Sequence, residues 1–372
     1  MDKLTLYFFV GTTAELIKLA PVIRECKKRK IKTVLVSSGQ NIVDLKDFKS
    51  IIGQGNWDIS LCKKSVKPSV FKFVLWVLKS FVETIKTFYN EFFKNNPGKK
   101  IVIVHGDTVS AVIGAFVGYI YRVPVAHVES GLRSFKMFEP FPEEINRILV
   151  SFFATIHFCP NNWSLNNLRR KSGIKVNTFN NTLVETVKWC LSQKLKYKLP
   201  LKKNSKYFVL IVHRQENVIF NKWRTINLIK YIIDNTPAGL SCVFVLHSVT
   251  QRYLGDSDFF NTVAKSRDVL FLPRMKMPDF VHIVRNSEFV ITDGGSNQEE
   301  MYYLGKPCLI LRNVTERIEG LKINVVLSKY NKRIIGSFLR NYTKYKTNPV
   351  LDISSSPSKI IIDEILNLCK VH

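Results

Sequence analysis

The sequence predicts an α/β protein of two doubly wound domains, and three observations support this fold class. Short apolar runs rich in Val, Ile and Phe alternate with longer segments of helical period, which is the order of βαβ units. The same alternation occurs in both halves of the chain. At 372 residues, of which 46% are hydrophobic, the chain is long enough for two domains with separate cores.

The predicted strands of the first half are apolar along their length, as expected for strands buried on both faces of a parallel sheet. They lie at residues 4–10, 32–38, 100–107 and 123–130. Helical periodicity is found at residues 14–29, 68–94 and 109–121. We therefore place a first domain at residues 1–175.

The second half repeats this order. Strands are predicted at residues 207–213, 242–247, 269–273, 288–293 and 307–312, and helices at 220–236, 257–265, 277–286, 297–304 and 358–370. A lysine-rich connection at 196–206 separates the halves, so the second domain is placed at 176–372, with the last helix able to pack back on the first domain. Two such domains facing each other would bind ligands in a cleft at the carboxyl ends of their strands.

Charge gives a weaker indication of function. Lys and Arg number 56 against 29 Asp and Glu, so the formal net charge is +27 and anionic partners are favoured. The lysines are spread along the chain, and no basic run is interleaved with aromatic residues, so we expect no nucleic-acid partner. A dedicated polyanion-binding surface remains the alternative.

The cysteines and the most apolar segment bear on location. Seven scattered cysteines, with no spacing typical of metal ligands, indicate a reducing cytoplasm and no metal site. Residues 70–93 are apolar, but Lys72, Lys79 and Glu83 interrupt them, so no membrane span is expected. We interpret this segment as an amphipathic helix packed on the sheet, with peripheral membrane contact as the alternative.

Two motifs follow strands of the first half. Gly11 precedes the first helix in a strand–turn–helix order that suits a phosphate, although a single glycine is weak evidence. Asp107, in VHGDT, stands at a strand tip and is either the N-cap of the next helix or a functional acid.

The motif VITDGGSNQEE in the second half is more informative. Asp293 ends a strand, the turn Gly294-Gly295-Ser296 offers backbone N–H groups, and Glu299 and Glu300 are expected in the first turn of the next helix. This pattern is typical of a nucleotide site, with phosphate at the helix N-terminus and a carboxylate on the ribose. The alternative is an acidic helix start that only complements the dipole.

Two more residues of the second half are candidates. Arg317 follows in a loop where it could bind a diphosphate, since arginine forms paired hydrogen bonds to such groups. His213 ends another strand, directly before Arg214 and close to Glu216, which favours a catalytic over a structural histidine.

Together these stretches resemble the UDP-N-acetylglucosamine 2-epimerase family. The matching pieces occur in family order from residue 5 to about 325: GTTAELIKLAP, VHGDT, HVESGLRS, FPEEINR, HRQEN, TDGGSNQEE, LGKP and TERIEG. The resemblance implies two Rossmann-like domains in the GT-B architecture, often as a homodimer, with UDP held mainly by the C-terminal domain. It implies no cofactor.

The resemblance also implies site residues. Carried over by motif, the acid/base candidates are Asp107, Glu129, Glu143 and His213, and the groups that would bind or balance the substrate are Lys18, Arg133, Arg147, Asp293, Gly294, Gly295, Ser296, Glu300 and Arg317. In this family the C2 proton of the sugar leaves with UDP to give a glycal, and both then add back with C2 inverted. Such a reaction needs acids and bases on both faces of the sugar, and cations for the diphosphate.

The sequence departs from the family in loops that face the ligand. Thr13 and Ala14 replace the usual arginine and proline, which leaves more of the phosphate role to Lys18, and Asn180 replaces a glycine in FNNT. The leading hypothesis is therefore interconversion of UDP-GlcNAc and UDP-ManNAc for surface polysaccharide. The alternatives are a hydrolysing 2-epimerase that releases ManNAc, a GT-B glycosyltransferase, and a UDP-sugar sensor.

Overall fold

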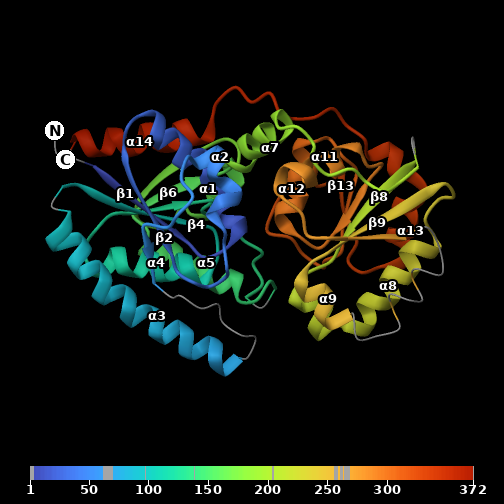
Figure 1. Ribbon diagram of the computed structural model, residues 1–372, viewed down its shortest axis with the longest axis horizontal. Coiled ribbons are helices and arrows are strands. Elements are labelled where there is room, and N and C mark those ends of the chain that lie inside the picture. The colour runs from blue at the N-terminus through green and yellow to red at the C-terminus, as the bar shows by residue number, and fades with distance from the viewer. Residues whose placement is uncertain are drawn as a thin grey trace. The chain divides into compact units, whose positions relative to one another are not determined.

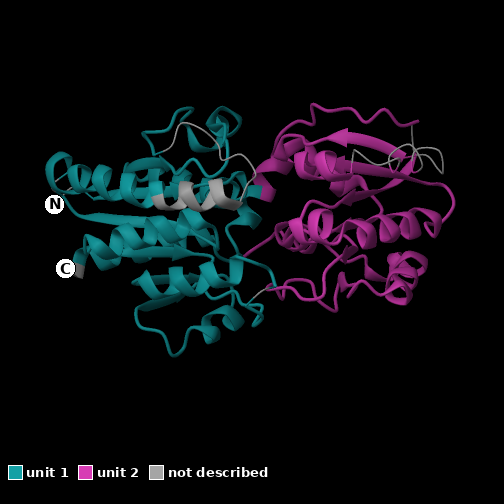
Figure 2. Ribbon diagram, turned by 90° about the horizontal axis from the view of Figure 1, so that it is seen from below, with its two compact units in different colours: residues 1–186, 354–372 teal, residues 187–353 magenta. Residues whose placement is uncertain are grey.

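The computed structural model describes residues 4–61, 70–96, 98–137, 139–202, 205–254, 259, 263 and 269–371. Figure 2 shows two compact units: unit 1 comprises residues 1–186 and 354–372, and unit 2 comprises residues 187–353. Each unit contains one parallel sheet, which confirms the predicted fold class of two doubly wound α/β domains.

The sheet of unit 1 has the strand order β3-β2-β1-β4-β5-β6-β7. Its strands are β1 (Thr5–Val10), β2 (Lys32–Ser37), β3 (Ile59–Ser60), β4 (Lys100–His105), β5 (Val125–Val128), β6 (Ile156–Cys159) and β7 (Ile174–Asn177). The order reverses between β1 and β4, so chain crossovers leave in opposite directions from this point. Ligands bind at such switch points in open α/β sheets.

Helices cover both faces of this sheet (Figure 1). On one face lie α1 (Thr13–Lys28) and α14 (Pro357–Val371), and on the other α3 (Val70–Asn90), α4 (Val109–Ile120) and α5 (Glu143–Phe153). The core on the α3–α4–α5 side joins Phe88 of α3 to Tyr7 and Phe9 of β1. Shorter helices α2 (Lys49–Ile52) and α6 (Asn162–Asn167) complete the unit, with α7 (Leu183–Ser192) at its end.

The sheet of unit 2 has the order β10-β9-β8-β11-β12-β13. Its strands are β8 (Lys206–Ile211), β9 (Leu240–Leu246), β10 (Val269–Pro273), β11 (Val290–Thr292), β12 (Cys308–Ile310) and β13 (Val325–Leu327). Among its described residues, α-helices are found at α8 (Lys222–Asp234), α9 (Ser248–Leu254), α11 (Met277–Asn286), α12 (Gly295–Tyr303) and α13 (Lys332–Asn341). A core of Phe208, Phe244, Phe289 and Phe338 lies between the sheet and helices α8 and α13.

The sequence predicts the long elements well and the short ones poorly. Strands β3, β6, β7 and β13 have at most four residues each and were not predicted, because such short runs carry little periodicity. Strands β5, β11 and β12 are as short, but they lie within longer apolar runs and were predicted. The edge strand β7 also has polar and half-exposed residues. The helix predicted at 257–265 lies outside the described residues except for Phe259 and Val263.

The division between the units differs from the one expected at residue 175. It falls within α7, after Thr186. Residues 354–372 belong to unit 1, which agrees with the expectation that the last helix could pack back on the first domain. The reason is that α14 packs against α1 and buries Ile361, Ile362 and Ile365 completely. An apolar helix face is stable only when another element covers it.

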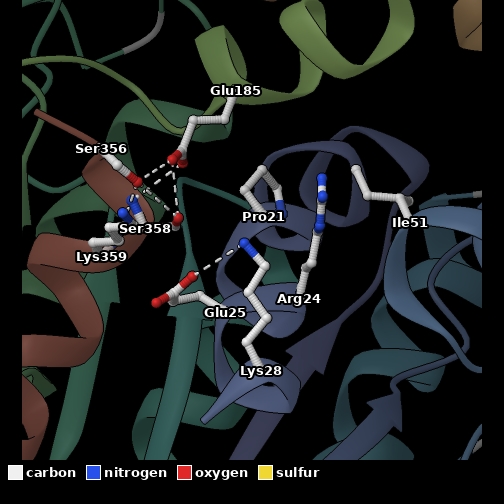
Figure 3. Close-up of a pocket in the computed structure, with 9 residues that line it drawn as sticks. All are labelled: Pro21, Arg24, Glu25, Lys28, Ile51, Glu185, Ser356, Ser358 and Lys359. Carbon is white, nitrogen blue, oxygen red and sulfur yellow. Dashed lines mark hydrogen bonds and ion pairs between the residues drawn. The ribbon is translucent and has the colours of Figure 1, made fainter. Parts of the chain in front are cut away.

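The first turn of α14 is tied to unit 1 by a carboxylate (Figure 3). Glu185 accepts hydrogen bonds from the hydroxyl and backbone N–H of Ser358 and from the Ser356 hydroxyl. Burial raises the pKa of Glu185, against the effect of these hydrogen bonds. The side chain thus supplies the N-terminal cap of α14 from a distant part of the chain.

Across the described parts of the chain, no helix combines the length and apolar character needed to cross a bilayer.

Replacing Glu185 by alanine should destabilise the first turn of α14, because the backbone N–H and the hydroxyl of Ser358 both lose their acceptor. We expect the amides of α14 to exchange with solvent roughly 5- to 30-fold faster, corresponding to the loss of a cap worth about 1–2 kcal/mol. Hydrogen exchange followed by mass spectrometry measures this. Asn367→Ala, an exposed change on α14, is the matched control, and equal protection in both variants would contradict the assignment.

Candidate functional site

Two sequence motifs meet at the carboxyl ends of β4 and β5 in unit 1. His105 ends β4 and pairs in register with Val128, which ends β5. The turn Gly106-Asp107 therefore lies beside Glu129, and a Cβ added to Gly106 would be 3.5 Å from Glu129 Oε1. The carboxylates of VHGDT and HVESGLRS thus leave neighbouring strand ends.

Glu129 is held in one position by its neighbours. Lys18 Nζ lies 2.5 Å from Glu129 Oε2, both side chains are 3% exposed, and Asn181 Nδ2 donates to the same oxygen. The backbone of Glu129 has φ +64°, a left-handed conformation that costs a non-glycine residue roughly 1–2 kcal/mol. A charge this deeply buried is tolerated only with a paired cation.

This pairing changes the role expected for Lys18. The sequence assigned it to the phosphate side of the substrate, but its ammonium group is buried against Glu129. Lys18 comes from α1, so the ion pair connects the first helix to the end of β5. We assign it to positioning Glu129.

Asp107 has its own cation. Arg147 of α5 donates from Nη2 to Asp107 Oδ2, and Asn146 Nδ2 donates to the Asp107 carbonyl at 2.8 Å. The N-cap of α4 is Thr108, whose hydroxyl accepts from Ala111 N at 3.0 Å. The N-cap alternative for Asp107 is therefore wrong, and its side chain is 22% exposed.

Helix α5 supplies two adjacent acids, Glu143, which the sequence analysis named, and Glu144, which it did not. Glu143 is the first residue of α5, directly after the N-cap Pro142, and is half-buried. Its neighbour Glu144 is fully buried and accepts from Arg133 Nε and from Ser134 N at 3.0 Å. Arg133 thus pairs with Glu144, which fixes the loop after β5 to α5.

The turn at Gly11 is already filled by a side chain. Glu15 Oε2 accepts from Gly11 N at 2.8 Å and Thr12 N at 2.7 Å, and Glu15 Oε1 accepts from the Thr108 hydroxyl at 2.6 Å. The N–H groups that suited a phosphate are therefore engaged by a carboxylate, so the phosphate interpretation of Gly11 is wrong. Burial raises the pKa of Glu15 to about 7, against the opposing effect of these hydrogen bonds.

In unit 2, Asp293 organises the loop that carries His213. Its carboxylate accepts from His213 N at 3.0 and 3.1 Å, from Arg214 N at 3.0 Å and from Asn217 Nδ2 at 3.0 Å. Asp293 is completely buried. Burial alone would raise its pKa, but the charge of His213 and these hydrogen bonds hold the pKa well below its usual value.

His213 remains accessible beside this carboxylate. Its Nδ1 is 3.2 Å from Asp293 Oδ1 and its side chain is 31% exposed. The ring stacks on His247 with centroids 4.5 Å apart. Burial, with the neighbouring charges of His213 and Arg274, lowers the pKa of His247 to about 3. His213 is therefore the imidazole of this pair that is placed for proton transfer, oriented by Asp293.

The glycine turn starts helix α12 next to His213. Gly294 is its extended N-cap, and a Cβ there would lie 3.0 Å from His213 Cε1. A Cβ on Gly295 would lie 2.7 Å from Glu316 Oε1, so glycine allows this close packing. Ser296 follows in the first turn and is half-buried.

The acidic residues of α12 lie deeper in the helix than expected. Since α12 begins at Gly295, Glu299 and Glu300 fall in its second turn, which contradicts the predicted first-turn position. Glu299 is fully buried and 2.8 Å from Arg317 Nη1. Glu300 is 4% exposed and accepts from Asn297 Nδ2 at 2.8 Å.

Arg317 is part of a buried ionic network. Besides Glu299, its Nε lies 3.6 Å from Glu316, which accepts from Arg312 Nη2 at 2.8 Å. These four residues are each at most 5% exposed. Arg317 therefore fixes the loop against α12, where the sequence expected it to bind diphosphate directly.

The motifs themselves were found, but several of the residues that position them were not. Glu15, Asn181, Glu144 and Asn217 all lay inside quoted motifs or beside quoted residues. The amino-acid sequence alone does not show that a side chain forms a hydrogen bond to a buried carboxylate or to a backbone N–H group. Glu15, Glu144 and Asn217 stood in motifs that already supplied site residues, GTTAELIKLAP, FPEEINR and HRQEN, so these motifs were the signal that could have indicated them.

Glu15→Gln should change how stability depends on pH. Because the pKa of folded Glu15 is raised to about 7, its contribution is fully present below about pH 4.5 and is lost as pH rises through 7. Wild type should lose more unfolding free energy than Glu15→Gln between pH 5 and pH 8, by at most about 3 kcal/mol. Urea denaturation measures this, with exposed Glu83→Gln as control. Parallel pH profiles would refute the assignment.

Known proteins resemble this chain over almost its whole length. The curated UDP-N-acetylglucosamine 2-epimerase of Neisseria meningitidis is 29% identical, with 98% of this chain and 99% of that protein aligned. The enzyme of Campylobacter jejuni is 27% identical over 85% of this chain and 83% of its own length.

Solved structures agree with this. The N. meningitidis UDP-GlcNAc 2-epimerase bound to UDP-GlcNAc superposes with a TM-score of 0.80 at 26% identity, covering 98% of this chain and all of that one. The Methanocaldococcus jannaschii enzyme, in complex with UDP-GlcNAc and UDP, gives 0.78 at 26% identity, covering 98% and 99%.

The sequence model of one family matches residues 24–350, which is most of the chain and includes nearly all of the motifs described above. The chain therefore belongs to the UDP-N-acetylglucosamine 2-epimerase family.

Proposed function

We propose that the chain inverts C2 of a UDP-N-acetylhexosamine, converting UDP-GlcNAc to UDP-ManNAc by elimination of UDP and re-addition to a glycal. The observation that carries this proposal is the pair of carboxylates, Asp107 and Glu129, on neighbouring strand ends with one cation each. The relatives solved with UDP-GlcNAc support the substrate class.

The chemistry assigns proton transfer to a few side chains. A sugar C2–H is barely acidic, so its removal needs a positioned base and a route to return the proton to the opposite face. Asp107, Glu129 and Glu143 of unit 1 and His213 of unit 2 are the groups for this task. Lys18 balances the buried carboxylate of Glu129 and Arg147 the half-buried carboxylate of Asp107, so that their positions are fixed before the substrate binds.

The nucleotide is assigned to unit 2. The first turn of α12 offers the backbone N–H groups of Gly295 and Ser296 and the positive end of the helix dipole to a diphosphate. Gly294, the N-cap, donates its own N–H to the Thr292 hydroxyl at 3.0 Å and so supports the turn. Glu300 lies one turn further and is the carboxylate for the ribose hydroxyls. Asp293 and Arg317 are both buried and paired with protein groups, so we assign them to holding this turn in place and not to contacting the ligand.

Other parts of the proposal follow from the same substrate. UDP-ManNAc is an activated sugar, so the product would serve surface polysaccharide synthesis, and a UDP-sugar enzyme of this kind is expected in the cytoplasm. A hydrolysing 2-epimerase, which releases free ManNAc, uses the same first step and is the second candidate.

Turnover in D2O should place deuterium at C2 of the product, because a proton held by a carboxylate or an imidazole exchanges with solvent. Proton NMR of UDP-GlcNAc incubated with the enzyme measures this. Asp107→Asn and Glu129→Gln should each lower the rate roughly 10²- to 10⁴-fold while UDP still binds. Asp234→Asn, an exposed change on α8, is the control and should keep the wild-type rate.

The products separate the alternatives. Labelled free ManNAc with UDP would indicate the hydrolysing enzyme. Turnover that leaves C2 fully protonated would exclude epimerisation and favour a glycosyltransferase, and binding without any turnover would favour a sensor.

A homodimer is the second part of the proposal, and an exposed aromatic face supports it. Tyr89 on α3, Phe93 after it, Tyr119 on α4 and Phe152 on α5 are each 53–63% exposed. Tyr89 and Phe93 contact the ring of Tyr121, and Tyr119 contacts Phe152 and Phe153, so the rings form two groups on the neighbouring helices α3, α4 and α5. Four such rings present roughly 400 Å², about half of the ~800 Å² per partner in a typical interface. Patches of this size mark association sites.

Phe152→Asp should convert the dimer to a monomer, because it places a charge inside the proposed contact. Sedimentation velocity should give about twice 42.9 kDa for the wild type and 42.9 kDa for the variant. Trp223→Asp, a change at a 72% exposed ring on α8, should remain dimeric. A monomeric wild type that binds anionic vesicles would instead favour the membrane alternative for this face.

A further inference from the structure

Two histidines and a serine form a buried chain beneath the site of unit 1. His127 lies in β5, His157 in β6, and Ser130 directly after Glu129, and each is at most 1% exposed. The Ser130 hydroxyl lies between the rings, 3.0 Å from Nδ1 of His127 and 3.0 Å from Nδ1 of His157. At the other end, His127 Nε2 is 2.9 Å from the carbonyl oxygen of Gly106.

The positions of the protons follow from donor and acceptor counting. The Gly106 carbonyl can only accept, so His127 carries its proton on Nε2 and presents a lone pair at Nδ1. Ser130 must then donate its single proton to His127 Nδ1. The remaining contact requires His157 Nδ1–H to donate to the Ser130 oxygen.

The burial of both rings keeps this arrangement stable. Burial, with the nearby charge of His157, lowers the pKa of His127 to about 3, so its Nδ1 stays an acceptor. Burial lowers the pKa of His157 to about 4, against the opposing effect of the Ser172 backbone. Among the described residues none forms a hydrogen bond with His157 Nε2, which leaves the ring proton to Nδ1. Even a protonated His157 would keep its Nδ1–H and its hydrogen bond to Ser130.

The hydrogen-bonded series His127–Ser130–His157 joins the two turns that carry the Asp107 and Glu129 carboxylates. Gly106 has φ +64° and precedes Asp107, and His127 binds its carbonyl. Glu129 also has φ +64°, and the next residue, Ser130, is fixed by its hydroxyl and by its backbone bond to Phe158 O at 2.9 Å. Glycine adopts this left-handed backbone freely, but at Glu129 it is strained, and such strain persists only where surrounding contacts determine it.

We infer that His127, Ser130 and His157 are positioning residues that set the spacing between the Asp107 and Glu129 carboxylates for the reaction. The inference rests on the proposed function of these two acids. A displacement of about 1 Å in a reacting group can cost roughly 10²-fold in rate, so a network that fixes two turns at once has a measurable effect.

The first test reads the protons directly and needs no activity. In protein labelled with ¹⁵N-histidine, long-range ¹H–¹⁵N correlation at pH 7 should show His127 as the Nε2–H tautomer and His157 as the Nδ1–H tautomer. The signals are assigned by loss in His127→Gln and His157→Leu. The opposite tautomer at either ring would overturn the inference, whatever the rate of turnover.

The second test uses a matched pair at His157. Asparagine places its amide N–H₂ near the former Nδ1 and can donate to Ser130, whereas leucine has the same size and no donor. Ser130→Ala and His157→Leu should lower kcat roughly 10- to 100-fold with the Kd for UDP within about twofold, and His157→Asn should recover most of the rate. Ser151→Ala is the control, because Ser151 is a buried serine of α5 that is not part of the hydrogen-bonded series.

The outcomes separate the inference from the proposed function. Wild-type kcat in Ser130→Ala, or equal rates in His157→Asn and His157→Leu, would overturn the positioning role while epimerisation stands. A wild-type enzyme that neither epimerises nor exchanges the C2 proton would overturn the proposed function, and the NMR result alone would then decide the proton arrangement.

Discussion

The buried ion pair between Lys18 and Glu129 is the interaction on which the site of unit 1 depends. It connects α1 to the end of β5, and it neutralises a carboxylate whose backbone is in a strained conformation. Without the ammonium group, Glu129 would be a buried and uncompensated charge, which no protein interior tolerates at low cost. Asp107 with Arg147 and Glu144 with Arg133 repeat the arrangement. In each case a residue of a helix fixes a loop at the strand ends.

Unit 2 also contains a buried carboxylate whose charge is compensated, but the compensating groups differ. Asp293 is a buried carboxylate that is compensated by hydrogen bonds from a loop rather than by one lysine or arginine, and the loop it organises presents His213. The buried network of Arg312, Glu316, Arg317 and Glu299 then holds the loop of residues 312–317 against α12. Charged residues that look like ligand contacts in the sequence are therefore, in several cases, the support behind the contact surface.

This distinction explains which predictions about the site were wrong. The phosphate interpretation of Gly11 failed because Glu15, four residues later, turns back and occupies its N–H. The first-turn position of Glu299 and Glu300 was wrong because α12 begins at Gly295, after an extended Gly294. Glu144 was overlooked beside Glu143 because two adjacent acids are equivalent in a sequence, although they point to different surroundings in a helix.

The sequence by itself determined the two doubly wound domains, the long strands and helices, and the motifs at the strand ends, because hydrophobic period and turn residues are local properties. Tertiary structure decided which carboxylate meets which cation, which N–H groups remain for a ligand, and that α14 returns to unit 1. These outcomes depend on contacts between residues far apart in the chain, such as Lys18 with Glu129 and Glu185 with Ser358. Their geometry is fixed by packing and desolvation, which no short stretch of sequence contains.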